Sequence, residues 1–328
     1  MPRNRIASRL VNTLERWKYR AIVSVKLLDP ARRLIRDIHV VRRGGVGDVL
    51  MTTPALRGLR SRFPHARIVV ETDYPELFEL NPYVNQAVRS TDGMDYDLML
   101  HMRYEDRYPL REHITDIYCR CAGVPPQGRT LDLFFTVTEH RAVLERLAPF
   151  RRPVVTLQPW AGPWTRNKDW DQKRWERVVE ALQRDHGVVC LQLGSPAEPY
   201  ITGAVDWRDK TTLREAALTI KYARLHLACN SSSEQLAHAV GTPAIVLYGT
   251  THPVISGYAD QLALYGGKTA TPCYHREPCE HRHAMEEIRV EDVLAAARRL
   301  FHRDVSKTGR RQKAPGTAMP SQQGARRW

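Results

Sequence analysis

Residues 37–72 read DIHVVRRGGVGDVLMTTPALRGLRSRFPHARIVVET. The stretch opens with an apolar, β-rich run and passes through three glycines in four positions. It continues with apolar residues at helical spacing over 47–63 and ends in a second β-rich run at 66–72. A strand, a helix and a second strand in this order are typical of a βαβ unit, in which the strands pair in parallel. The stretch therefore predicts an α/β fold built on parallel sheets.

The same alternation recurs along the chain. After a proline-containing stretch that ends near residue 150, a second series of strands and helices begins. We therefore predict two doubly wound sheets with a division near residue 150. The further strands are expected at 96–102, 153–159, 188–194, 225–230 and 243–249, and the further helices at 171–187, 211–223 and 232–241.

The positive charge of the chain lies at its two ends. The formal net charge is +14, of which residues 1–37 carry +7 and residues 302–328 carry +6. Residues 38–301 are therefore close to neutral, at +1. A nucleic-acid-binding body would carry a basic face, so we expect no nucleic acid among the partners.

The two basic ends differ in pattern. Residues 1–37 form a basic amphipathic arm, with Ile6, Leu10 and Leu14 at helical spacing between Arg and Lys residues. This pattern fits a helix at a membrane interface or a helix docked on the protein's own core, and both interpretations remain open. Residues 302–328 contain few apolar residues and are predicted to be a disordered basic tail.

No apolar run of membrane-spanning length and no signal peptide is apparent in the sequence. We therefore expect a cytoplasmic protein that contacts the inner face of the cytoplasmic membrane through its basic arm.

The cysteines are interpreted as reduced thiols. Cys273 and Cys279, with His281 and His283 nearby, offer the soft ligands that a tetrahedral metal site uses. Their spacing is irregular, so we favour ordinary thiols and expect neither a metal nor a cofactor.

In doubly wound sheets, ligands bind beyond the carboxyl ends of the strands. The first such turn contains Gly44, Gly45 and Gly47, followed by Asp48. Its amides fit an anion at a helix N-terminus, but a tight turn with Asp48 offsetting the helix dipole explains it equally. The turn lacks the Lys-Ser/Thr of a phosphate-binding loop and the third glycine of a dinucleotide fingerprint, although Glu71 ends the next strand.

Three turns in the second half also carry polar residues. Thr165 and Lys168 suit a diphosphate, unless Lys168 is a solvated surface charge. Glu198 suits a pair of ribose hydroxyls. Asn230 is predicted to be a helix N-cap that leaves the amides of residues 231–233 for a phosphate, or to serve capping alone. Together the four turns indicate a site between the two sheets for a nucleotide-linked donor.

The chain resembles the heptosyltransferase family, glycosyltransferase family 9, over about residues 38–300. The opening motif RRGGVGDVLMTTPALRGLRSRFPHARI carries the resemblance first. It continues in order through LQPWAGPWTRNKDWDQKRW, GSPAEP and CNSSSEQLAHAVGTPAIVLYGTTHP.

The resemblance implies a GT-B fold, in which two Rossmann-like domains face each other across a cleft. The domains are expected at 38–150 for the acceptor and 151–301 for the nucleotide-sugar donor. The implied reaction is inverting transfer of a heptose or related sugar from an ADP-sugar, ADP-heptose in the family. The acceptor is a lipid-linked glycan such as the lipopolysaccharide core.

The resemblance also implies roles for residues. Asp48 matches the general base, Lys168 the lysine at the donor diphosphate with Thr165 close to it, and Glu198 the acid at the ribose. The glycines at 44, 45 and 47 let the backbone approach the acceptor and the diphosphate. The donor-binding segment matches Asn230, Ser231, Ser232, Ser233 and Gln235.

That last segment departs from the family pattern Asp-Ser/Thr-Gly-x-x-His. Asn230 replaces the acid, Ser232 the glycine and Gln235 the histidine. Two alternatives stay open beside a transferase. One is a degenerate, non-catalytic binder of a sugar nucleotide or glycan, which these replacements suggest. The other is an NAD-dependent oxidoreductase, which the glycine turn and Glu71 suggest.

Overall fold

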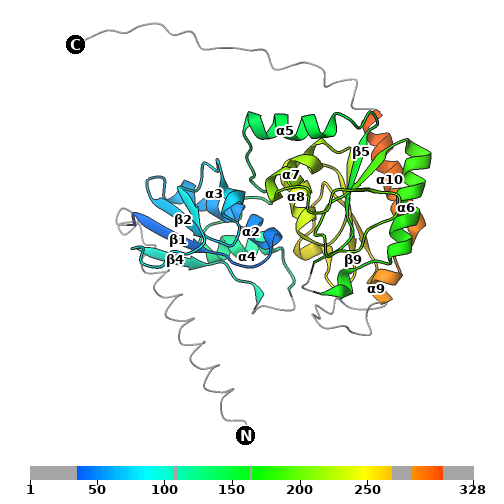
Figure 1. Ribbon diagram of the computed structural model, residues 1–328. Coiled ribbons are helices and arrows are strands. Elements are labelled where there is room, and N and C mark those ends of the chain that lie inside the picture. Colours follow the sequence, from blue (N-terminus) through cyan, green and yellow to red (C-terminus); the bar gives the residue numbers. More distant parts are fainter. Residues whose placement is uncertain (1–34, 106–109, 163–164, 268–282, 306–328) are drawn as a thin grey trace.

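The computed structural model describes residues 35–105, 110–162, 165–267 and 283–305. Two parallel sheets dominate this part of the chain (Figure 1). The first sheet has the order β3-β2-β1-β4. Its strands are β1 (Asp37–Val41), β2 (Arg67–Glu71), β3 (Gln86–Val88) and β4 (Leu98–His101). The strands predicted at 37–43, 66–72 and 96–102 are confirmed, whereas β3 was not predicted.

The second sheet has six parallel strands in the order β10-β9-β8-β5-β6-β7. They are β5 (Val154–Gln158), β6 (Val189–Gln192), β7 (Val205–Asp206), β8 (Leu225–Cys229), β9 (Ala244–Tyr248) and β10 (Leu262–Tyr265). The four central strands were predicted. The edge strands β7 and β10 were not, because both are short and bear half-exposed side chains.

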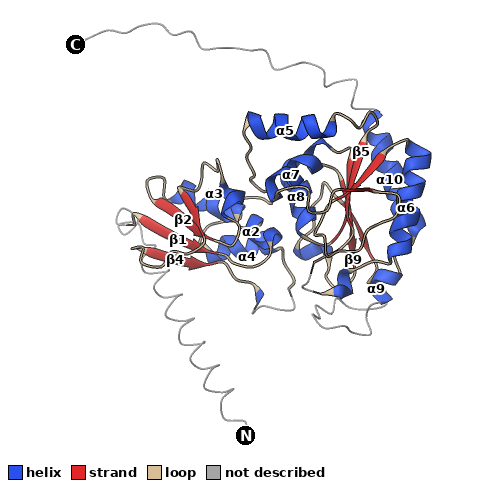
Figure 2. Ribbon diagram, viewed as in Figure 1, coloured by secondary structure: helices blue, strands red, loops and turns tan. Residues whose placement is uncertain are grey.

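Helices cover both faces of the second sheet, as the strands and helices of Figure 2 show. Helices α6 (Gln172–His186) and α10 (Val290–Val305) pack on one face through an apolar cluster that includes Trp175 and Val293. Helices α7 (Leu213–Tyr222) and α8 (Ser232–Val240) cover the other face. A single buried cluster runs from the first sheet through α7 and α8, with Leu218 and Leu236 among its members. The predicted α/β class is therefore confirmed.

The helix predicted over 47–63 is two helices, α2 (Val46–Leu50) and α3 (Thr53–Arg62). The Thr52 amide bonds to the Val49 carbonyl, at 3.1 Å. A new series of helical hydrogen bonds then begins, in which the Leu56 amide bonds to the Thr52 carbonyl. Pro54 lies in the first turn of α3 and has no amide hydrogen to continue the first helix. The Thr52 and Thr53 hydroxyls bond to the carbonyls of Val49 and Leu50, which satisfies the end of α2. The remaining helical elements are α4 (Ile114–Cys121), α5 (Val137–Leu147) and α9 (His283–Glu286), with short 3₁₀ turns η2 (Pro75–Phe78), η4 (Arg166–Lys168) and η5 (Pro253–Ile255).

Helix α2 packs directly onto α8, so the glycine turn of the first sheet touches the second sheet's helix layer. A Cβ atom on Gly47 would lie 2.9 Å from Gln235 Cγ and 3.3 Å from Ser232 Cα. Both distances are tighter than ordinary carbon contacts, so only glycine allows this approach. Gly47 therefore sets the distance between the two helices.

Arg214 on α7 is a second junction. Its buried guanidinium pairs with Glu139 of α5, with Nε 2.6 Å from Oε1, and lies 3.2 Å from Glu79. It also donates to the carbonyl oxygens of Glu76, at 2.9 Å, and Phe134, at 2.7 Å. One side chain thus ties together α7, α5 and the segment after β2. Helix α5 precedes the predicted boundary at residue 150 but packs on α7, and the division into domains stays a prediction.

Several predictions concern residues that the structure does not describe. The basic arm was predicted over residues 1–37 and the disordered tail over residues 302–328. Residues 1–34 and 306–328 lie outside the described ranges, whereas Asp37 begins β1 and residues 302–305 belong to the end of α10. No helix in the described part of the chain has the length and the apolar composition that a bilayer-spanning segment needs.

Replacing Arg214 with Met should lower the free energy of unfolding by about 2 to 4 kcal/mol, because Glu139 keeps its charge and loses its partner. The matched control is Arg177→Met, since Arg177 and Glu291 are an exposed pair. That change should stay within about 0.5 kcal/mol. Urea unfolding followed by circular dichroism measures both.

The same ion pair predicts a pH dependence. The hydrogen bond from Arg214 lowers the pKa of Glu139 from 4.5 to about 2. A depressed carboxyl pKa adds stability above its ordinary value that is lost as the pH falls through the folded value. The wild type should therefore lose more stability than Arg214→Met between pH 4.5 and about 2. Equal slopes for the two proteins would contradict this assignment.

Candidate active site

Asp48 lies in the first turn of α2, just beyond β1, and its two carboxylate oxygens have different partners. Oδ1 accepts a hydrogen bond of 2.7 Å from the Tyr104 hydroxyl. Oδ2 lies 3.3 Å from an Arg42 nitrogen. The side chain is 23% exposed, so it remains accessible at the surface of the turn. Asp48 is therefore held in one orientation, and its carboxylate oxygens keep lone pairs that can accept further hydrogen bonds.

Arg42 is itself held in place by residues other than Asp48. It is buried, donates to the Met102 carbonyl at 3.0 Å and pairs with Glu105 at 2.5 Å. Its guanidinium carbon lies 5.1 Å from the ring centre of Tyr104 and 5.6 Å from that of Tyr118. Sequence reasoning missed these residues. The one available signal was the position of Arg42 directly after β1, where side chains meet the site.

The three glycines of the turn have distinct roles. Gly44 has φ +106° and donates its amide to Asp73 at 3.0 Å. That amide is therefore used within the protein, which corrects the expectation that all three glycines present amides to an anion. Gly45 is the N-cap of α2, and Gly47 lets α2 approach α8.

Lys168 ends the 3₁₀ turn η4, and Thr165 stabilises that turn. The Thr165 hydroxyl accepts from the Asn167 amide at 3.2 Å, so it shapes the loop that carries Lys168. Lys168 is half-buried rather than a solvated surface charge. Burial lowers its pKa, while the negative charges of Asp48 and Glu234 act to raise it. Lys168 of the second sheet thus lies within electrostatic range of Asp48 of the first.

The turn after β8 differs from the prediction. The helix α8 begins at Ser232 with Ser231 as its N-cap, so Asn230 is not the cap. Asn230 is buried, and its side-chain amide group bonds to the side chains of Glu234, Ser256 and Thr251. Ser231 and Ser233 share a contact of 3.2 Å between their hydroxyl oxygens.

Glu234 and Gln235 follow in α8, and both are buried. Glu234 accepts hydrogen bonds from Asn230 Nδ2, at 2.6 Å, and from the Tyr248 hydroxyl. Burial raises the pKa of Glu234 to about 7, although these bonds and the Lys168 charge oppose that rise. Gln235 accepts from the Tyr258 hydroxyl and contacts the Ser256 carbonyl. Sequence reasoning assigned no role to Glu234.

Glu198 lies at the carboxyl end of β6, with Oε2 3.3 Å from the Ser195 amide nitrogen. Burial and the nearby charge of Asp169 raise the pKa of Glu198 to about 7. The charges of Glu198 and Lys168 both act on Cys229, the last residue of β8.

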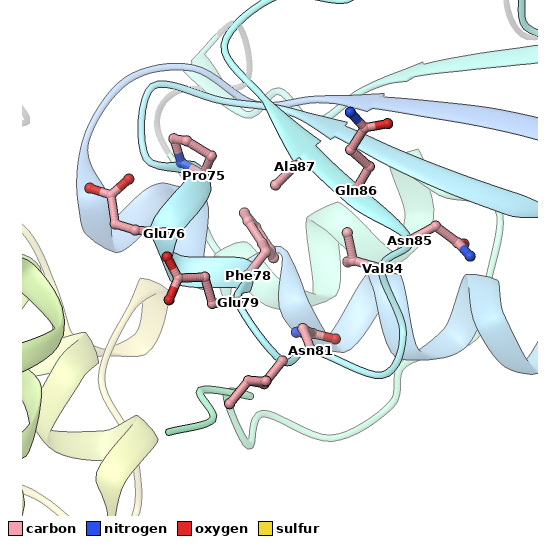
Figure 3. A pocket seen from close by; sticks show the side chains of 10 residues that line it. Pro75, Glu76, Phe78, Glu79, Asn81, Val84, Asn85, Gln86 and Ala87 are labelled. Carbon is pink, nitrogen blue, oxygen red and sulfur yellow. The ribbon is translucent and has the colours of Figure 1, made fainter. Parts of the chain in front are cut away.

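The structure therefore places Gly47 and the turn that carries Asp48 against α8, and the charge of Asp48 acts on Lys168. Of the proposed metal ligands, Cys273, Cys279 and His281 lie outside the described residues, as does the side chain of His283. Within the described ranges, no cluster of three potential metal ligands occurs. A pocket of about 470 Å³ lies beside η2 and β3, lined by Glu76, Glu79 and Asn81 among others (Figure 3). Its lining includes none of the predicted site residues.

Residues 126–284 match the model of glycosyltransferase family 9 (heptosyltransferase). Lipopolysaccharide heptosyltransferase 3 of Escherichia coli K12 is 24% identical, over 80% of this chain and 98% of its own.

Two solved structures share the fold at 18% identity. The family 9 glycosyl transferase of Veillonella parvula has a TM-score of 0.66 and covers 82% of this chain and 97% of its own. The E. coli ADP-heptose lipopolysaccharide heptosyltransferase II has a TM-score of 0.65 and covers 82% and 99%. The predicted GT-B architecture is thereby confirmed. The family model and the curated relative agree that the chain is similar to the heptosyltransferases of glycosyltransferase family 9, and these similarities indicate a glycosyltransferase.

Proposed function

We propose that this protein is an inverting transferase that moves a heptose or related sugar from an ADP-sugar to a glycan acceptor of the lipopolysaccharide core type. One observation carries the proposal. Asp48 follows the first strand of one sheet and lies on α2, which packs on α8, and Lys168 follows the first strand of the other sheet, where the charge of Asp48 acts on it. A base in this position suits deprotonation of the acceptor hydroxyl, and a cation suits the negative charge that develops on the leaving group.

The proposed reaction begins with proton removal at Asp48. Its carboxylate takes the proton of an acceptor hydroxyl, and the hydroxyl oxygen attacks the anomeric carbon of the donor. The bond to the nucleotide diphosphate breaks, and its electrons stay on the leaving group. Tyr104 and Arg42 keep the Asp48 carboxylate oriented, so little ordering remains for the reaction itself.

The leaving group needs stabilisation as its charge builds. Lys168 supplies a half-buried positive charge, which interacts more strongly with a phosphate oxygen than a charge in bulk water would. Thr165 holds the turn that carries Lys168. We assign the turn of residues 230–235 to the donor as well, and Glu198 to the ribose hydroxyls, since it ends a neighbouring strand.

The relatives' names support the choice of substrates. One structural relative is described as an ADP-heptose lipopolysaccharide heptosyltransferase, and the curated relative as a lipopolysaccharide heptosyltransferase. We therefore assign the donor to the ADP-heptose class and the acceptor to lipid-linked core glycans. An acceptor of that kind lies at the inner face of the cytoplasmic membrane, where we expect the protein to work.

The Asp48→Asn variant tests the base. It keeps the shape and a hydrogen-bond acceptor but cannot take the proton, so turnover should fall by about 10²- to 10⁴-fold. Transfer from an ADP-heptose donor is followed by mass spectrometry. Calorimetry should find ADP affinity nearly unchanged, and wild-type turnover in this variant would remove Asp48 from the role.

The Lys168→Met variant tests the diphosphate contact. Loss of a charged hydrogen-bond donor should weaken ADP binding by about 10- to 100-fold. Lys173→Met is the matched control, because Lys173 is exposed on the neighbouring helix α6. ADP affinities that are equal in the two variants would contradict the assignment of Lys168.

The basic arm is proposed to bind the anionic membrane surface. Residues 1–34 carry nine Lys and Arg and two acids, and each basic residue near such a surface contributes about 1 kcal/mol. Deleting residues 1–34 should abolish pelleting with anionic vesicles at low salt. Transfer to a soluble acceptor fragment should be unchanged. Neutral vesicles are the control, and undiminished pelleting of the truncated protein on anionic vesicles would exclude the arm as the contact.

A further inference from the structure

His238 lies in the last turn of α8, and the proposed reaction does not use it. Its ring has oxygen acceptors on two sides. Nδ1 lies 2.9 Å from Oδ1 and 3.0 Å from Oδ2 of the Asp260 carboxylate. Nε2 lies 3.0 Å from the Arg129 carbonyl oxygen. The His238 side chain is only 12% exposed, so these contacts are largely shielded from water.

Two acceptors of this kind require two donors. Neither a carboxylate nor a carbonyl oxygen has a hydrogen to donate, so each contact needs an N–H group of the ring. A neutral imidazole has one N–H group and can bond to only one of the two oxygens, whereas the doubly protonated ring bonds to both. The complete set of contacts therefore depends on the second proton of His238.

Arg129 belongs to the connecting segment, residues 122–136, which joins α4 to α5. The Arg129 guanidinium pairs with Asp116 of α4, at 2.9 Å. Three residues further on, the Asp132 amide donates to the Thr53 hydroxyl of α3, also at 2.9 Å. The connecting segment is thus anchored on α3 and α4, and the contact with His238 fastens it to α8 as well.

Tyr258 packs against His238 and extends the group toward the turn after β8. The two rings are stacked, with centroids 3.5 Å apart and planes 9° from parallel. His113, the N-cap of α4, contacts the Tyr258 ring at a centroid distance of 5.2 Å. The Tyr258 hydroxyl donates to Gln235 Oε1, and Gln235 is the side chain that a Cβ on Gly47 would meet. The His238 ring therefore supports the tyrosine that orients Gln235.

We propose that His238 is a positioning residue that fastens the connecting segment to α8 and holds Tyr258, and through it Gln235, in place. The doubly protonated ring makes both hydrogen bonds, and loss of one proton releases one of them. The assignment of Gln235 to the donor rests on the proposed function, whereas the contacts of His238 do not.

The charged and titratable groups that face His238 come from α4, the connecting segment and the segment before β10. They are Asp260, Arg129 with its partner Asp116, Tyr258 and His113. Burial lowers the pKa of His113 to about 4 and raises the pKa of Tyr258 well above its usual range. Both rings therefore stay neutral between a pH of about 6 and about 9, so His238 is the residue of this set whose ionisation an experiment in that range follows.

Limited digestion with trypsin tests this without any substrate. Trypsin cleaves after Arg129, at the carbonyl that His238 contacts, so cleavage requires this contact to open. The initial rate in the full-length protein, read by peptide mass spectrometry, is divided by the rate for a free peptide of residues 126–133, which removes the pH dependence of trypsin itself. In the wild type this relative rate should rise about tenfold between a pH of about 6 and about 9. A relative rate that does not change with pH would overturn the proposal.

Three variants sharpen the experiment. His238→Phe keeps a flat ring against Tyr258 but has no N–H group, so it should be cleaved at the faster rate at both pH values, and a wild-type rate at a pH of about 6 would overturn the proposal. The matched control is His186→Phe, because His186 on α6 also stacks on a ring, that of Phe301, and should behave as the wild type. Asp260→Asn keeps an oxygen acceptor without the charge that favours a protonated ring, so the rise should move to lower pH. If His238→Phe does not fold, an unchanged pH profile in Asp260→Asn would overturn the proposal.

ADP affinity, measured by calorimetry, tests the effect on Gln235. Tyr258→Phe keeps the stacked ring but loses the hydroxyl that bonds to Gln235, so affinity should fall about three- to tenfold at every pH while cleavage after Arg129 stays as in the wild type. In the wild type, affinity should decline over the pH range in which cleavage rises. An ADP affinity of His238→Phe equal to that of the wild type at a pH of about 6 would overturn the positioning role. Failure of the wild type to bind ADP would refute the proposed function and leave the cleavage result standing.

Discussion

The close packing of α2 on α8 brings the turn that carries Asp48 against the second half of the molecule. Gly47 sets that approach, because any Cβ at this position would meet Gln235 and the backbone of Ser232. A larger residue would push the helices apart and weaken every Coulomb interaction across the contact, since those energies fall with distance. One glycine therefore couples the packing of two sheets to the electrostatics of the site.

The strands and the site positions were predictable for one physical reason. Buried parallel strands are continuous apolar runs, and their carboxyl ends mark where ligands bind, so Asp48, Lys168 and Glu198 could be named from local pattern. Strand β7 escaped prediction because its two residues gain their structure by pairing with β6. The single helix predicted over 47–63 was wrong because the effect of Pro54 was not applied.

What sequence could not supply were contacts between residues far apart in the chain. Tyr104 and Asp48 are 56 positions apart, and nothing local to either residue indicates their hydrogen bond. Asn230 was taken for an N-cap because Asn favours that position, but burial and the Thr251 and Ser256 hydroxyls offered it better partners. Glu234 was visible in the sequence, but its burial, which raises its pKa to about 7, is created only by the fold.

The charges of the site alternate in sign from one sheet to the other. Glu105 pairs with Arg42, Arg42 with Asp48, Asp48 influences Lys168, and Lys168 influences Glu234. Each buried charge thus has an opposite neighbour, which offsets part of the penalty for removing it from water. In the proposed reaction Asp48 loses its charge by taking a proton while the diphosphate beside Lys168 gains charge. The negative charge moves from one neighbour of Lys168 to another, so the electrostatic balance around this lysine is kept throughout the transfer.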